Sequence, residues 1–323
     1  MQKKEIKMGA YGLHQYVVNG TMWLPDDGCV EKVVHIVHGM TEHMGRYESF
    51  AEDLTPYGIA VVGFDLRGHG RNSGGLEAAT FLSGQKNDDE YGWERSVEDI
   101  KRQIEKFQKT FPRAEYYLLG FSLGSFLVRD LIRTFGLKGV NGVILAGTGY
   151  QPSIVTSIMK MVAKSQISQA NIGGTTKLVK TLTFETYNKK FDPDGNGCGM
   201  EWLCSDTAEL ATYMQDQLVR ENIAADLFYE MMCAMHKVNK KRALKGDKNI
   251  RNVPILLISG SDDAVGDYGK GIHKVADIME AYGAKHVRKL ILKNARHDVF
   301  HEYESGAYDR MILILLRWLG VEL

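Results

Sequence analysis

The segment Gly120-Phe121-Ser122-Leu123-Gly124 contains the first residues whose types and spacing could do chemistry. It follows a short apolar run and opens a helical pattern, and a serine on such a strand-to-helix turn presents its hydroxyl at the end of a sheet. Glycines two residues to either side leave room for a strained backbone. We therefore predict that Ser122 is a nucleophile for acyl transfer; the alternative is an ordinary serine in a turn.

A serine hydroxyl attacks a carbonyl only when a base takes its proton, and that base is commonly a histidine oriented by a carboxylate. Asp262 and Asp263 follow a later strand-like run, and His297 follows the next one. Open α/β sheets place their sites at the carboxyl ends of strands, so these residues are expected beside Ser122. Either aspartate could orient the histidine. His301 competes with His297 but lies further from the end of its strand.

The tetrahedral intermediate of acyl transfer carries an oxyanion that needs backbone N–H donors. One expected donor is Leu123, which follows the nucleophile, and the other is Met40 in the loop after the first central strand. Gly39 would permit the tight turn that aims Met40. We also expect His38 and Gly39 to contact substrate.

Alternating apolar runs and helical patterns predict an α/β fold with a mostly parallel, doubly wound sheet. A hairpin turned at Asn19-Gly20 is expected to add antiparallel strands at one edge. The expected central strands are Val33–Gly39, Ile59–Asp65, Tyr116–Phe121, Val140–Ala146, Val253–Gly260 and Val287–Leu292. The clearest helical patterns are Trp93–Phe111, Leu123–Phe135 and Tyr308–Leu319.

About a hundred residues separate two of these strands, far more than an ordinary crossover needs. We interpret residues 149–238 as an inserted helical cap, which leaves 1–148 and 239–323 as the core domain. Its first helix carries an apolar stripe that includes Ile154 and Ile158, with lysines off the stripe. These two isoleucines are expected to contact substrate; alternatively, the stripe touches a lipid surface transiently.

Five segments in this order resemble the α/β-hydrolase superfamily and, more narrowly, its monoacylglycerol lipase and lysophospholipase branch. The resemblance selects Asp263 as the acid and His297 as the base. It implies hydrolysis of monoacylglycerols, lysophospholipids or other medium-to-long acyl esters through an acyl-enzyme. A thioesterase, a serine aminopeptidase or a non-catalytic binding protein on the same scaffold are the alternatives. The segments are His38–Tyr47, Gly63–Gly74, Gly120–Ser125, Gly260–Gly266 and Asn294–Glu302.

The composition agrees with an enzyme that acts on small molecules. Lys+Arg and Asp+Glu both total 40 in 323 residues, so the formal charge of zero gives no support to a nucleic-acid partner. The four cysteines form no CxxC pair, and no metal or organic cofactor is expected. The charged N-terminal stretch lacks the apolar core of a signal peptide, which predicts a cytoplasmic protein.

Overall fold

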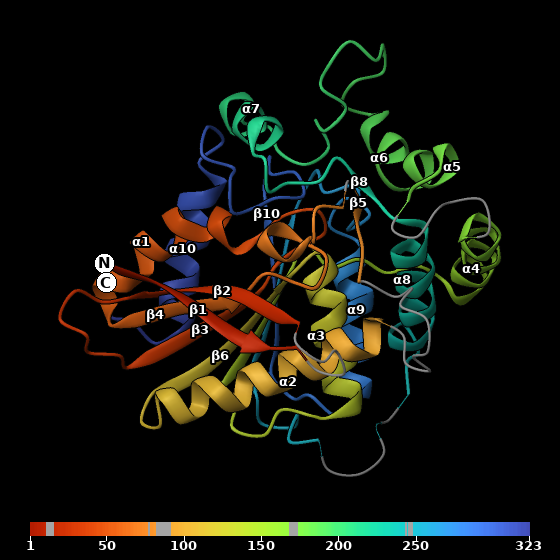
Figure 1. The fold of residues 1–323 in the computed structure, drawn as a ribbon. Helices are drawn as coiled ribbons and strands as arrows, with labels where there is room; N and C mark the ends of the chain where they lie inside the picture. The colour runs from red at the N-terminus through yellow and green to blue at the C-terminus, as the bar shows by residue number, and fades with distance from the viewer. Residues whose placement is uncertain (11–15, 77, 82–91, 168–173, 243, 245–247) are drawn as a thin grey trace.

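The structure, a computed structural model, describes the whole chain except residues 11–15, 77, 82–91, 168–173, 243 and 245–247. An eight-stranded sheet of order β1-β2-β4-β3-β6-β7-β9-β10 forms its centre (Figure 1). All pairs from β4 to β10 are parallel, whereas β1 and β2 add antiparallel pairs at one edge. The predicted α/β-hydrolase architecture is therefore confirmed. The strands are β1 (Gln2–Gly9), β2 (Val17–Leu24), β3 (Lys32–Val37), β4 (Ile59–Phe64), β6 (Glu115–Phe121), β7 (Gly142–Ala146), β9 (Ile255–Gly260) and β10 (Val287–Leu292).

The central strands are largely apolar because both faces of the sheet are covered. Side chains alternate along β3, so Val33 and Val37 pack on one face while Val34 and Ile36 pack on the other. Helices α2 (Gly92–Thr110), α3 (Leu123–Thr134) and α9 (Gly271–Ala281) contribute to the first of these layers. The second is formed with α1 (Glu48–Leu54) and α10 (Ala307–Trp318), on the opposite face of the sheet (Figure 1).

The N-terminal hairpin exists, but its predicted turn at Asn19-Gly20 is wrong. Both residues lie inside β2, where Asn19 pairs with Lys7 and Gly20 with Ile6. A Cβ on Gly20 would lie 2.4 Å from the carbonyl oxygen of Gly63, so the glycine serves the close approach of β2 to β4. The connection itself falls on residues 11–15, outside the described part of the chain.

The long insertion between β7 and β9 is mostly helical, and we call residues 149–238 the cap segment. Its division from the core as a separate domain remains a proposal. In Figure 1 helices α4, α5, α6 and α8 of this segment lie to the right of α3, whereas α7 lies above α10. Helix α8 packs against both α3 and α4. Its elements are α4 (Ser153–Ile167), α5 (Lys177–Lys180), a π-helical turn (Thr181–Glu185), α6 (Thr186–Asn188), α7 (Thr207–Gln215), β8 (Asn222–Ile223) and α8 (Ala225–Val238).

Both ends of the cap segment are held by Arg129 of α3. Its Nη1 donates to the carbonyl oxygen of Gly149 at 3.0 Å, and its Nη2 donates to Val238 O at 3.2 Å and to Asn239 Oδ1 at 2.7 Å. Burial lowers the pKa of Arg129 to about 10, so the guanidinium is charged at neutral pH. One buried cation thus joins the places where the chain leaves the core and returns to it.

The described structure also contains a few short elements, among them a 3-10 turn and a two-residue strand. The 3-10 turn Met44–Tyr47 leads into α1, and strand β5 (Ala78–Ala79) pairs with β8 of the cap segment. Within the described ranges, no helix has the length and apolar content needed to cross a bilayer.

Candidate active site

Ser122 occupies a sharp turn between β6 and α3. Its φ of 49° and ψ of −116° lie in a region that residues with side chains rarely adopt. The neighbouring glycines explain how the turn fits. A Cβ on Gly124 would lie 1.9 Å from the carbonyl oxygen of Val37, and one on Gly120 would lie 2.7 Å from Gly124 O. The predicted spacing therefore has a steric cause, since no larger residue fits at either position.

Three of the predicted residues form one continuous hydrogen-bonded chain. His297 Nε2 lies 2.8 Å from Ser122 Oγ, and His297 Nδ1 lies 2.8 Å from Asp263 Oδ1. Asp263 is fully buried, and its Oδ1 also accepts from the Val265 N–H at 2.9 Å. With Asp263 ionised, Nδ1 donates to the carboxylate, which leaves Nε2 free to accept the serine proton.

The two competing residues point elsewhere. Asp262 forms an ion pair with Lys190 of the cap segment at 3.0 Å. His301 bonds instead to Asp298 at 2.8 Å and to the carbonyl oxygen of Arg46 at 3.0 Å. Although burial opposes it, the charges of His301 and Arg46 lower the pKa of Asp298, which stays ionised in this cluster.

The loop that carries Met40 is held by a buried carboxylate. Glu42 accepts hydrogen bonds from the Gly39 N–H and from the Tyr47 hydroxyl, the latter at 2.7 Å. Thr41 next to it has a φ of 68°, which marks a tight turn. In the described part of the chain the Met40 N–H has no hydrogen-bond acceptor. The N–H of Leu123, the first residue of α3, has no acceptor within its own helix.

His38 and Gly39 support this loop and do not line the cavity beside Ser122. The fully buried His38 ring accepts from the Leu66 N–H at 2.8 Å and donates to the carbonyl oxygen of Gly39 at 2.7 Å. Burial lowers the pKa of His38 to about 4, so the ring is neutral and has one donor and one acceptor. His38 and Gly39 therefore stabilise the conformation of this loop.

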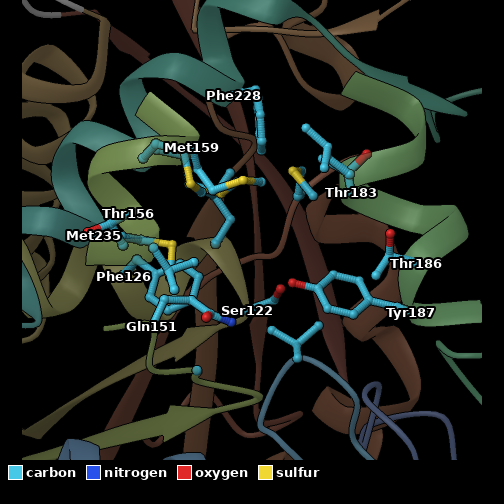
Figure 2. Close-up of a pocket in the computed structure, with 18 of the residues that line it drawn as sticks. Ser122, Phe126, Gln151, Thr156, Met159, Thr183, Thr186, Tyr187, Phe228 and Met235 are labelled. Atoms are coloured by element: carbon cyan, nitrogen blue, oxygen red, sulfur yellow. The ribbon is translucent and has the colours of Figure 1, made fainter. Parts of the chain in front are cut away.

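A cavity of about 230 Å³ opens on Ser122, between the core and the cap segment (Figure 2). Ser122, Met40 and Leu123 all line this cavity. Much of its wall is apolar and contains flexible methionines, which adapt to irregular ligands. This apolar wall includes Phe126, Val155, Met159, Leu182, Phe228, Met231, Met232 and Met235.

Ile154 and Ile158 are not among the residues of this wall. They are 76% and 50% exposed, so they project from α4 into solvent. Val155 and Met159, one position further along the same helix, line the cavity instead. The sequence analysis found the correct helix, but the structure turns a different side of it toward Ser122.

Trp202 of the cap segment packs directly onto His297. The two rings lie 5.2 Å apart, and Phe121 covers the histidine at 5.2 Å as well. Trp202 is itself packed by Phe184 and Tyr187, at centroid distances of 5.9 Å and 5.5 Å. Sequence reasoning missed this aromatic group, because no spacing relates it to Ser122 or His297.

Comparison with known proteins identifies the family of this chain. The family model described as serine aminopeptidase, S33, matches residues 28–304. The chain belongs to this family of α/β-hydrolases. It is accordingly a serine hydrolase, and the resemblance noted from the motifs is confirmed.

Relatives in this family carry lipase and esterase names. The chain is 24% identical over 299 residues to a monoglyceride lipase of Homo sapiens, covering 89% of this chain and 86% of the relative. It is 25% identical over 289 residues to a monoglyceride lipase homolog of Monkeypox virus, covering 86% and 90%. A thermostable carboxyl esterase from Bacillus coagulans shares the fold, with a TM-score of 0.81 at 21% identity over 99% of this chain and 98% of the other.

Proposed function

We propose that this protein hydrolyses carboxylic esters of acyl chains, with Ser122 as nucleophile, His297 as base and Asp263 as the carboxylate that orients the base. The observation that carries the proposal is the unbroken chain of two 2.8 Å hydrogen bonds between these residues. A serine on a strained turn, in contact with a histidine that a buried carboxylate orients, is suited to acyl transfer.

The proposed reaction has two steps. His297 Nε2 takes the proton of Ser122 as Oγ attacks the ester carbonyl, and the imidazolium then protonates the leaving alcohol. This gives an acyl-enzyme, which a water activated by the same histidine hydrolyses to release the acid. The Met40 and Leu123 N–H groups would donate to the oxyanion in both steps.

The cavity supports an acyl ester as the substrate. Its methionine-rich wall suits an apolar chain, and relatives in the family are named monoglyceride lipases. We therefore propose monoacylglycerols, lysophospholipids and similar esters as the substrate class.

A serine aminopeptidase is the second candidate, because the matching family model carries that description. A peptidase that captures a free amine needs a carboxylate in its pocket. Of the described residues that line the cavity, none is an aspartate or glutamate. This favours an uncharged ester over a peptide with a free amino terminus.

A fluorophosphonate probe tests the nucleophile. We expect it to label the wild type covalently and to leave Ser122→Ala unlabelled, with heat-denatured wild type as the negative control. Absence of labelling in folded wild type would overturn the proposal. A panel of esters graded by acyl length then tests the substrate class. Equal rates across the panel, together with fast peptide cleavage, would favour the peptidase.

A further inference from the structure

Tyr187 reaches the cavity from α6 of the cap segment. Figure 2 shows its ring extended across the cavity, with the hydroxyl directed toward Ser122. Both residues line the same cavity. Nothing in the proposed mechanism uses this hydroxyl, although it points at the nucleophile.

The Tyr187 hydroxyl has no hydrogen-bond partner among the described residues. The neighbouring threonines on the same wall differ in this respect. Thr183 donates its hydroxyl proton to the carbonyl oxygen of Val179 at 2.8 Å, and Thr186 donates to Thr181 O at 2.7 Å. Tyr187 is half-buried and lines the cavity, so its hydroxyl is open to the cavity and free to bond with a molecule there.

The hydroxyl is a hydrogen-bond donor throughout the neutral range. Burial, and to a smaller degree the charge of Asp263, raises the pKa of Tyr187 to about 12. It therefore remains protonated at neutral pH, and it can donate to an ether or hydroxyl oxygen.

The packing of the ring places Tyr187 on the side of the leaving group. Its ring lies 5.5 Å from Trp202, which in turn lies 5.2 Å from His297. His297 delivers the proton to the departing alcohol, so the alcohol half of the ester must lie near this histidine. The methionines on α8 form a separate, apolar part of the wall, which suits the acyl half.

We propose that Tyr187 is a specificity-determining residue that donates a hydrogen bond to the alcohol half of the substrate. It would favour esters whose alcohol has a free hydroxyl close to the ester bond, as in glycerol monoesters, over simple alkyl esters. This inference rests on the proposed function, because it assumes that Ser122 attacks an ester in this cavity.

The test compares two esters with the same acyl chain, one of glycerol and one of ethanol. We expect Tyr187→Phe to lower kcat/KM for the glycerol monoester by about tenfold, which is the usual cost of losing one buried hydrogen bond. The value for the ethyl ester should change by less than about twofold. The phenyl ring keeps its packing on Trp202, so the thermal midpoint should be close to that of wild type.

Thr183→Val is the matched control, since it removes a hydroxyl from the same wall that already donates to the backbone. We expect it to leave the ratio of the two kcat/KM values unchanged. Equal losses for both esters in Tyr187→Phe, or no loss for either, would overturn the inference. Fluorophosphonate labelling, which involves no alcohol half, should proceed at the wild-type rate in Tyr187→Phe. Failure of wild type to label would count against the proposed function instead.

Discussion

The reaction centre and the wall of the cavity are held in different ways. Around Ser122 the packing of the backbone allows no side chain at the two flanking glycines, because a Cβ on Gly120 or Gly124 would clash with other backbone atoms. The wall opposite is formed by adaptable side chains such as Met159 and Met235, contributed by separate helices of the cap segment. The chemistry therefore depends on a few short segments, whereas substrate choice depends on packing between distant ones.

Among these predictions, the largest change in activity is expected from a substitution in the reaction centre. We expect Asp263→Asn to lower kcat by about 10³–10⁴-fold, because the amide would no longer hold His297 in the tautomer that accepts the serine proton. Asp262→Asn is the matched control one residue away, and its partner is the half-exposed Lys190. It should change kcat by less than about threefold. Ester hydrolysis measured on both purified variants decides the assignment; a reversed order of effects would move the acid to Asp262.

An intermediate effect should come from the junction between the two regions. Replacing Arg129 by Met would leave the buried carbonyl groups of Gly149 and Val238 without their donor. We expect the free energy of unfolding to fall by about 3 kcal/mol, and proteases to cut the cap segment faster. Urea denaturation and limited proteolysis measure the two quantities.

Arg133→Met, one turn further along α3, is the control for Arg129. Its ion pair with Asp130 is more exposed and does not reach the cap segment. It should lower the free energy of unfolding by no more than about 1 kcal/mol. If both variants lose the same stability and resist proteases equally, Arg129 has no special role at the junction.

The smallest effect should come from the outer face of the cap segment. The double variant Ile154→Ser/Ile158→Ser should hydrolyse a dissolved short-chain ester at the wild-type rate, since neither residue lines the cavity. With a substrate held in vesicles we expect a loss of about threefold to tenfold, because apolar contact with the lipid surface is reduced.

Leu313 and Ile314 on α10 are also exposed, at 50% and 39%, and provide the matched control. Replacing them by Ser should affect neither rate. If vesicle hydrolysis is the same for wild type and for the Ile154/Ile158 variant, the predicted lipid contact of α4 is incorrect.

The sequence predicted the sheet, most helix positions and Ser122 because each depends on local patterns. The same patterns left two aspartates and two histidines as candidates, and the resemblance to the family selected Asp263 and His297. Apolar runs mark buried strands, and the glycine spacing marks the turn. The errors arose where distant contacts decide the outcome. Gly20 resembled a turn residue but serves a close approach to Gly63. On α4, hydrophobic periodicity identified an apolar stripe, yet it could not show that this stripe faces outward. The contact between Trp202 and His297 left no pattern in the sequence at all.

The hydrogen bonds from Arg129 to both ends of the cap segment have a consequence for how sequences of this fold can diverge. The cap segment begins and ends beside the same guanidinium. For the stability of the core, the segment is therefore equivalent to a loop whose two ends are held close together. The entropy of closing a loop grows only with the logarithm of its length, by about 0.6 kcal/mol for each doubling. Insertions, deletions or an exchanged cap would therefore cost the sheet little stability. Selection could replace the segment that chooses the substrate while the reacting groups beneath it stay in place.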